Sequence, residues 1–286
     1  MRILKSTICY ILLFGILAAH AADIPFKSAD PYLGAIVVEA ESGEVLFEDN
    51  ADAVGYPASV IKLLNLLVVL EEIDAGNISL EDEIRVTAEA AGMGGSQVYL
   101  AENEVFSVED LLYAMIVQSA NDAATALAIY IAGSKEAYVE MMRDTAARIG
   151  MTSTDVQSVH GLPPGRGQAP DLTTARDLAL LSRELVKRPD VFPYTSTRER
   201  DFRDGKFIMR THNPLLLELP GCDGLKTGYF SRAGFSISAT MERHGNRIIA
   251  VLLDSKVRKT RNEKAAALLK NGFRELAKRR RARYAE

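Results

Sequence analysis

The chain has 286 residues, of which 48% are hydrophobic and 25% are charged, and its formal net charge is −4 at pH 7. This length suits one large domain or two small ones, and the composition is that of a globular protein with a sizeable core. The acidic balance argues against a nucleic-acid-binding protein, because such proteins usually carry a strongly basic surface.

The first 21 residues have the three features of a secretory signal peptide in the expected order. Arg2 and Lys5 form a basic start, residues 8–19 form an apolar run, and Ala19-His20-Ala21 has the small-x-small form of a cleavage site. The apolar run is shorter than the ~20 residues needed to span a bilayer. We therefore expect cleavage after residue 21 and a periplasmic or cell-envelope location.

Two strands and a long helix are predicted after this segment. Residues 33–39 and 44–48 are rich in apolar and β-branched side chains and flank the turn signal Glu41-Ser42-Gly43, a pattern typical of a hairpin. Residues 59–74 are apolar nearly all round and end at Ala75-Gly76-Asn77, which predicts a buried helix.

This helix begins with Ser59-Val60-Ile61-Lys62, the first of three short motifs. Residues three apart share a helix face, so Ser59 and Lys62 project together from the helix N-terminus, where developing negative charge is favoured. A serine hydroxyl needs an adjacent base to act as a nucleophile, and Lys62 can be that base only when it is neutral. Burial and a second cation both lower the pKa of a lysine, and Lys226 is our candidate for that cation.

The middle of the chain predicts a cluster of helices. Ser107 is expected to cap one of them, and the others are expected over 122–132, 135–149 and from about 172 to 187. The second motif, Ser119-Ala120-Asn121, lies on a short connector between two of these helices.

Two interpretations of the second motif remain open from the residues alone. Ser119 could relay a proton to a leaving amine, while Asn121 could hold Lys62 or a substrate carbonyl. Both residue types are also favoured helix N-caps, so the motif could instead have a capping role.

Strands return after residue 200. Asp204-Gly205 predicts a hairpin turn within 202–210, and His244-Gly245-Asn246 predicts another between strands at 234–241 and 247–253. A last helix is expected from about Lys259 into the basic end of the chain. Strands from both chain ends with helices between them favour an α/β protein of the α+β type, with an antiparallel sheet and an inserted helical cluster.

The third motif, Lys226-Thr227-Gly228, leads towards a predicted strand. A strand edge can bind an extended peptide through its main chain, and Gly228 permits close approach of the backbone. Lys226 and Thr227 have side chains suited to a terminal carboxylate. Taken alone, the motif is equally compatible with a solvated turn.

All three motifs occur in order and far apart, and over roughly residues 32–274 the chain resembles the serine-type D-alanyl-D-alanine carboxypeptidases of peptidase family S11, the low-molecular-mass penicillin-binding proteins. The segments that support this resemblance are 118–123, 159–162, 174–179 and 223–228. The resemblance implies a β-lactamase/transpeptidase-like catalytic domain over 22–274, a basic tail over 275–286 and no C-terminal β-domain.

The resemblance also implies catalytic roles for four residues. Ser59 would be the acyl-ester nucleophile, Lys62 the proton acceptor, and Ser119 and Asn121 the second motif.

The implied substrate-binding residues are Lys226, Thr227, Gly228, Tyr229 and Arg261. The oxyanion hole would use the backbone N–H groups of Ser59 and Tyr229, and Arg261 would lie near the substrate carboxylate.

The implied reaction removes the terminal D-alanine from peptidoglycan stem peptides through an acyl-enzyme on Ser59. The alternatives are a D,D-endopeptidase of the same family, a class A β-lactamase and a non-catalytic penicillin-binding module. The deacylating Glu-x-x-x-Asn pattern of class A β-lactamases does not occur between Asn121 and Lys226, which counts against that class.

The expected partners are peptidoglycan stem peptides and β-lactams, without nucleic acid and without a stable membrane anchor. No cofactor or metal is expected, because the four histidines show no ligand spacing. The basic residues 278–283 are compatible with weak contact to anionic lipid head groups or cell-wall polymer, and also with a solvated helix end.

Overall fold

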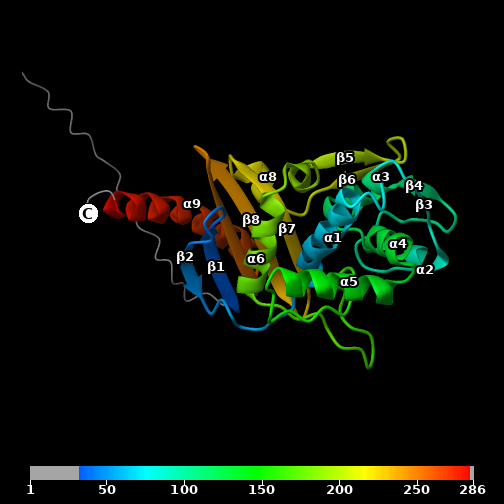
Figure 1. The fold of residues 1–286 in the computed structure, drawn as a ribbon, viewed down its shortest axis with the longest axis horizontal. Helices are drawn as coiled ribbons and strands as arrows, with labels where there is room; N and C mark the ends of the chain where they lie inside the picture. Colours follow the sequence, from blue (N-terminus) through cyan, green and yellow to red (C-terminus); the bar gives the residue numbers. More distant parts are fainter. Residues whose placement is uncertain (1–31, 284–286) are drawn as a thin grey trace, which may run out of the picture.

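A five-stranded antiparallel sheet joins the two ends of the chain (Figure 1). This computed structural model describes residues 32–283, so the predicted signal segment lies outside the described residues. The strand order is β2-β1-β9-β8-β7, and every neighbouring pair is antiparallel. The strands are β1 (Gly34–Glu39), β2 (Val45–Asp49), β7 (Cys222–Phe230), β8 (Gly234–Arg243) and β9 (Asn246–Ser255). The predicted α+β fold is confirmed.

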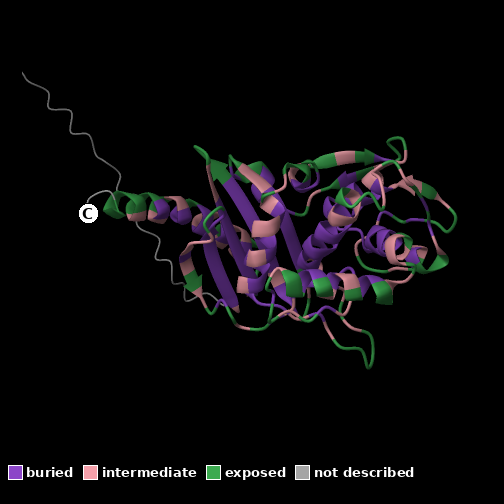
Figure 2. Ribbon diagram, in the orientation of Figure 1, coloured by how far each residue is buried: buried purple, intermediate pink, exposed green. Residues whose placement is uncertain are grey.

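Both faces of the sheet are buried, because successive side chains of a strand point to opposite faces. Val37 belongs to the apolar cluster beneath α9 (Arg258–Arg283), whereas its neighbour Ile36 belongs to the larger cluster that includes α6 (Ala175–Val186). Figure 2 shows the central strands buried along most of their length. The sheet is therefore a rigid, doubly covered support for its outermost strand, β7.

The predicted helical cluster lies beside the sheet and surrounds one buried helix (Figure 1). The predicted helix over 59–74 is present, but its first turn is a 3₁₀ helix, as is frequent at helix N-termini. Ser107 caps its helix as predicted, because its hydroxyl accepts the N–H of Asp110 at 3.0 Å. The elements of the cluster are η1 (Ala58–Ile61), α1 (Lys62–Asp74), α2 (Ala88–Ala91), α3 (Val108–Ile116), α4 (Asn121–Ala132) and α5 (Lys135–Arg148).

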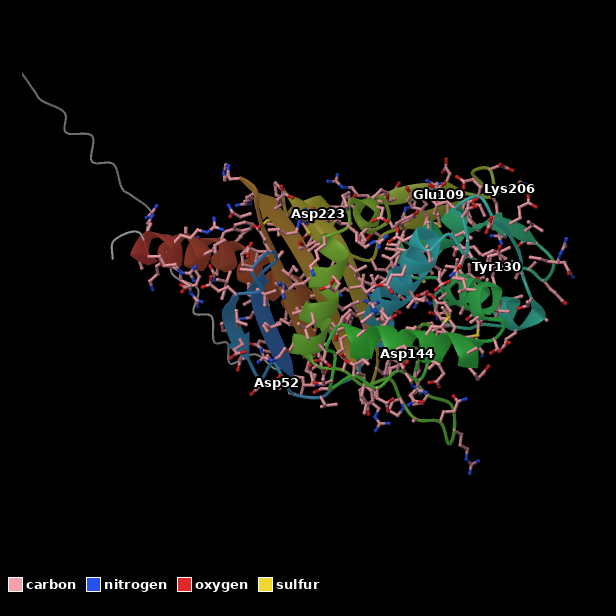
Figure 3. The ribbon with its side chains drawn as sticks, viewed as in Figure 1. Asp52, Glu109, Tyr130, Asp144, Lys206 and Asp223 are labelled. Carbon is pink, nitrogen blue, oxygen red and sulfur yellow. The ribbon has the colours of Figure 1, made fainter. Side chains whose placement is uncertain are left out.

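Two pairs of short antiparallel strands and three short helices complete the described residues. The hairpin around Asp204-Gly205 forms as predicted between β5 (Glu199–Phe202) and β6 (Phe207–Arg210), and Lys206 lies at its tip in Figure 3. The other pair, β3 (Glu83–Arg85) and β4 (Val105–Ser107), was not predicted, because three residues per strand are too few for a clear alternation. The helices are η2 (Pro189–Val191), α7 (Phe192–Thr195) and α8 (Leu215–Glu218).

The segment expected as a basic tail continues the last helix, α9, as far as Arg283. Leu276 is buried, and Arg279 donates to the carbonyl of Val45 at 2.9 Å and pairs with Glu44 at 3.0 Å. This part of the tail is therefore attached to the sheet at β2. Within residues 32–283, no helix combines the length and apolar character needed to cross a membrane.

Candidate active site

Ser59 and Lys62 meet at the junction of η1 and α1. Residues three apart are eclipsed in a 3₁₀ turn, so the two side chains lie directly over one another. Lys62 Nζ lies 2.9 Å from Ser59 Oγ, and the lysine side chain is fully buried. The site thus contains a hydroxyl in direct contact with a desolvated amine.

Lys62 Nζ has two further partners, and both can only accept. It donates to Asn121 Oδ1 and to the main-chain oxygen of His160, each at 2.7 Å. A neutral amine has two N–H donors and one lone pair. Because the two oxygens use both N–H donors, the lone pair of neutral Lys62 is left for the hydroxyl of Ser59.

The surroundings of Lys62 favour that neutral form. Burial is the main cause that holds the pKa of Lys62 well below its usual value, and the charge of Lys226 lowers it further. Lys226 is therefore the second cation that the sequence predicted. The carboxylates of Asp171 and Asp122 act in the opposite direction and raise the pKa of Lys62.

The second motif brings two more side chains to the same place. Ser119 lies on the connector between α3 and α4 with a positive φ of 62°, a conformation that non-glycine residues rarely adopt. Its hydroxyl accepts from Lys226 Nζ at 2.9 Å. Asn121 donates its amide to the carbonyl of Gly94 at 2.7 Å, which turns Oδ1 towards Lys62. The capping alternative is wrong, because the N-cap position of α4 is Ala120 and no side chain caps it.

The third motif lies within strand β7 rather than before a strand. Strand β7 has one neighbour in the sheet, β8, so its other edge is open towards the cleft. A Cβ atom on Gly228 would lie 2.6 Å from the carbonyl oxygen of Pro57 and 3.0 Å from the main-chain nitrogen of Ser59. A glycine is therefore required for β7 to lie this close to the turn that carries Ser59.

A cleft of about 510 Å³ opens over Ser59, Ser119 and Thr227. Tyr229 is 51% exposed in this cleft and stacks on Phe235, with ring centroids 4.1 Å apart. Arg258, Arg261 and His212 also line it, and no carboxylate among the described residues does. This distribution of charge suits an anionic group.

Burial changes the titration of the cations around the cleft. It lowers the pKa of Lys226 to about 7, with a further contribution from Arg261. It lowers the pKa of Arg261 to about 10, and that guanidinium donates to the carbonyl of Ser236 at 3.2 Å. His212, beside several of these cations, has a pKa lowered to about 4 by burial and is neutral at pH 7.

One contact of the site was missed by sequence reasoning, the main-chain carbonyl of His160. The segment His160-Gly161 carries no side-chain pattern that predicts a contact to Lys62. A Cβ atom on Gly161, where φ is +80°, would overlap the carbonyl oxygen of Ala58, so this turn lies directly against the residue before Ser59. Nowhere in residues 32–283 do three or more His, Cys, Asp or Glu side chains gather in a way that could hold a metal ion.

The chain is similar in sequence to known proteins. The family model of peptidase S11, described as D-alanyl-D-alanine carboxypeptidase, matches residues 25–257. The carboxypeptidase DacF of Bacillus subtilis is 33% identical over 242 residues, which are 84% of this chain and 61% of the relative. DacC of Escherichia coli is 36% identical over 248 residues, 84% of this chain and 60% of the relative. The chain thus spans about three fifths of the length of these two relatives.

Solved structures show the same fold. Penicillin-binding protein D2 of Listeria monocytogenes, in its ampicillin-bound form, has a TM-score of 0.77 and 32% identity, and the match covers 85% of this chain and 97% of that one. Penicillin-binding protein 6B of Escherichia coli has a TM-score of 0.79 and 32% identity, with 86% and 78% of the two chains covered.

Proposed function

The chain belongs to peptidase family S11, the D-alanyl-D-alanine carboxypeptidases, and we propose that it removes the terminal D-alanine from peptidoglycan stem peptides. One observation carries the proposal. Lys62 is a fully buried amine whose two N–H donors meet Asn121 and His160, with Ser59 Oγ as its third neighbour at 2.9 Å. That arrangement suits proton transfer from the serine to the lysine.

In the proposed acylation step, Ser59 Oγ attacks the carbonyl carbon of the penultimate D-alanine while its proton passes to Lys62 Nζ. The backbone N–H groups of Ser59 and Tyr229 hold the oxyanion. The C–N bond then breaks, and Ser119 Oγ gives a proton to the leaving amine. Lys226 Nζ, 2.9 Å from Ser119 Oγ, replaces that proton. The products of this step are D-alanine and an ester on Ser59.

Water hydrolyses this ester in the second step. Neutral Lys226 takes a proton of the attacking water through Ser119, and protonated Lys62 returns its proton to Ser59 Oγ as the ester bond breaks. Every proton moved in acylation is thereby restored, and the enzyme needs no cofactor.

Substrate binding in this proposal uses the open edge of β7 and the cations behind it. An extended stem peptide pairs with the main chain of β7, as in other strand-addition complexes. Its terminal carboxylate contacts Lys226, Thr227 and Arg261. The absence of carboxylates among the described residues that line the cleft supports this orientation, because none would repel the anionic end of the peptide.

The test is release of free D-alanine from a stem pentapeptide that ends in D-Ala-D-Ala. We expect release by the wild-type protein and none by the Ser59→Ala variant. The proposal is wrong if the wild-type protein traps labelled penicillin but releases no D-alanine. That result indicates a non-catalytic module, whereas cleavage restricted to cross-linked peptides indicates an endopeptidase, and rapid turnover of penicillin indicates a β-lactamase.

We also propose that the chain is exported and that its catalytic domain spans residues 22–274.

A second proposal is that the basic end of α9 makes weak contact with anionic surfaces. The support for the contact is that Lys278, Arg280 and Arg281 are exposed, whereas Arg279 is engaged by Glu44. We expect co-sedimentation with vesicles that contain phosphatidylglycerol and none with phosphatidylcholine alone. Equal sedimentation with both vesicles would remove the electrostatic explanation.

A further inference from the structure

The turn that supplies the His160 carbonyl is built around the hydroxyl of Ser158. Ser158 Oγ accepts the N–H of Gly161 at 2.8 Å and that of His160 at 3.4 Å. Three consecutive peptide units are therefore folded over one side chain. Without that hydroxyl, the N–H groups of Gly161 and His160 lose the acceptor that keeps the turn folded.

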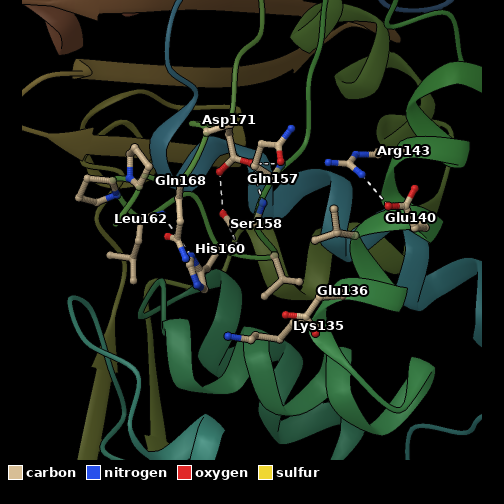
Figure 4. A pocket seen from close by; sticks show the side chains of 15 residues that line it. Lys135, Glu136, Glu140, Arg143, Gln157, Ser158, His160, Leu162, Gln168 and Asp171 are labelled. Atoms are coloured by element: carbon tan, nitrogen blue, oxygen red, sulfur yellow. Dashed lines mark hydrogen bonds and ion pairs between the residues drawn. The ribbon is translucent and has the colours of Figure 1, made fainter. Parts of the chain in front are cut away.

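The carboxylate of Asp171 accepts further hydrogen bonds from this turn (Figure 4). One oxygen of Asp171 accepts the N–H of Gln157 at 2.6 Å and that of Ser158 at 2.8 Å, and the other accepts the hydroxyl of Ser158 at 2.6 Å. Asp171 is only 5% exposed. Burial raises the pKa of Asp171, whereas the three groups bonded to it are all donors and favour the ionised form.

The turn then docks on one face of α1 through two consecutive carbonyls. The carbonyl of Val159 accepts the side-chain amide of Asn65 at 2.9 Å, and the carbonyl of His160 accepts Lys62 Nζ at 2.7 Å. Lys62 and Asn65 are three residues apart and so lie on the same face of the helix. The position of the acceptor for Lys62 therefore depends on the shape of the turn.

We propose that Asp171 and Ser158 are positioning residues for the reaction, which act on Lys62 through the main-chain carbonyl of His160. The hydrogen bonds of Asp171 and Ser158 fix that carbonyl where it accepts one N–H of Lys62. With this N–H engaged, the lone pair of neutral Lys62 is directed to Ser59 Oγ. The inference rests on the proposed function, because it assumes that Lys62 is the base that activates Ser59.

Asp171 also contributes its charge. The charged and titratable groups that act electrostatically with Lys62 are Lys226 on β7, Asp122 on α4, Asp171 and His160 on the loop, and His212 before α8. Asp171 raises the pKa of Lys62, whereas Lys226 lowers it. His160, whose pKa burial lowers to about 3, and His212, at about 4, are neutral at pH 7. Acylation of Ser59 should slow at low pH, where Lys62 becomes protonated, and this acid limb of the pH–rate profile marks the pKa of Lys62. Loss of the Asp171 charge lowers that pKa and therefore moves the acid limb to lower pH.

The test measures the rate of Ser59 acylation by a labelled penicillin from pH 5 to 10 in the full chain. For Asp171→Asn we expect a rate at the plateau roughly 10- to 100-fold lower, as is usual when a catalytic group is displaced by about 1 Å, with little change in the non-covalent affinity for penicillin. We also expect its acid limb at lower pH than that of the wild-type protein. Ser158→Ala should slow acylation as well, and Ser158→Thr, which keeps a hydroxyl, should restore most of the rate.

Asp177→Asn is the matched control. Asp177 is 4% exposed and accepts the N–H of Ser153 at 2.8 Å and the hydroxyl of Thr154 at 2.7 Å, so it anchors the same loop with similar bonds. It is not among the groups that shift the pKa of Lys62. We expect a comparable loss of thermal stability in this variant, with the acid limb unmoved and the acylation rate close to wild type.

Two results would overturn the inference. In the first, Asp171→Asn folds and is acylated at the wild-type rate, with its acid limb unmoved. In the second, Asp171→Asn and Asp177→Asn are both acylated slowly and at the same rate. If Asp171→Asn does not fold, equal rates in Ser158→Ala and Ser158→Thr decide against it. Failure of the wild-type protein to be acylated at all would instead refute the proposed function.

Discussion

The protonation state of one buried amine decides the chemistry proposed for Ser59. Lys62 contacts Ser59, Asn121 and His160, and its pKa is lowered by burial and by Lys226. An amine in this position is neutral at a pH at which an exposed lysine is charged. The function therefore depends as much on what surrounds Lys62 as on the lysine itself.

Replacement of the base by a permanent cation tests this dependence. In Lys62→Arg we expect acylation of Ser59 by penicillin to fall roughly 10²- to 10⁴-fold, because a guanidinium stays protonated and cannot accept the proton. Stopped-flow measurement of acylation checks this. Circular dichroism serves as the control for folding, and a folded variant that is acylated at the wild-type rate would contradict the assignment of the base.

Lys226 influences the pKa of Lys62, and the direction of the pKa change on its removal can be stated. Lys226 lowers the pKa of Lys62, so in Lys226→Gln that pKa rises and less Lys62 is neutral at a given pH. We expect the acid limb of the acylation profile to move to higher pH, besides any loss in rate. Arg261→Gln also removes a buried cation, but Arg261 lowers the pKa of Lys226 and not that of Lys62, so this variant should not move the acid limb to higher pH. A limb that stays in place in Lys226→Gln would contradict the tuning role.

For single residues, the sequence is more informative about side chains than about the direction of main-chain groups. The motifs identify Ser59, Lys62 and Lys226 by residue type and spacing, and the structure brings these three together. The carbonyl of His160 could not be predicted, because every residue has a carbonyl and its direction depends on the fold. The network of Asp171 is hidden for the same reason, since most of its partners are backbone N–H groups.

Two glycines allow the elements around Ser59 to approach one another closely. Gly228 lets β7 approach the main-chain nitrogen of Ser59, and Gly161 lets the loop approach the carbonyl of Ala58. The turn that carries Ser59 is therefore held between a strand of the sheet and a loop of the helical cluster. Small displacements of either element should move Ser59.

Gly161→Ala tests this arrangement, with Gly167→Ala as the matched control. Both glycines have nearly the same φ, +80° and +81°, but a Cβ at Gly167 has nothing within 4 Å, whereas one at Gly161 meets the Ala58 carbonyl. We expect a loss of about 1 kcal/mol in the free energy of unfolding for Gly167→Ala from backbone strain alone. The loss should be clearly larger for Gly161→Ala, with slower acylation.

Chemical denaturation and acylation kinetics provide the comparison. Equal effects of the two variants would show that the contact with Ala58 is unimportant.

Element boundaries were predicted better where periodicity is strong than where tertiary contacts decide. The buried helix after Ser59 follows from its continuous apolar run, but its 3₁₀ start does not. Strand β7 extends through Lys226-Thr227-Gly228, because pairing with β8 continues past the motif. The end of α9 was expected to be solvated in one interpretation, yet Glu44 and β2 hold Arg279, a contact between residues far apart in sequence.

Across the whole molecule, buried cations at the junction of sheet and helices impose a cost on folding. Lys226 is 3% exposed and its pKa is lowered to about 7, while a lysine in the unfolded chain titrates near 10.4. Between these two pH values the unfolded state binds more protons than the folded state, so this group makes stability rise with pH. Burial of Lys226 in the site therefore lowers the stability of the folded protein below about pH 10.

Lys226→Met removes this titration. We expect the free energy of unfolding of the variant, relative to the wild-type protein, to be most favourable near pH 7 and to decline as the pH rises towards 10. The slope of the difference should be at most about 1.4 kcal/mol per pH unit. Urea denaturation of both proteins at several pH values measures it. A difference that does not change with pH would show that Lys226 keeps an ordinary pKa in the folded protein.

The most direct test of the proposed acylation of Ser59 is the location of the covalent adduct that penicillin forms and the dependence of its formation on Lys62. The protein is incubated with penicillin, digested and analysed by mass spectrometry, alongside Ser59→Ala and Lys62→Arg. We predict one adduct, on the peptide that contains Ser59, which is absent in Ser59→Ala and forms far more slowly in Lys62→Arg. An adduct on another peptide, or an adduct on Ser59 that forms equally fast in Lys62→Arg, would contradict the proposed roles of Ser59 and Lys62.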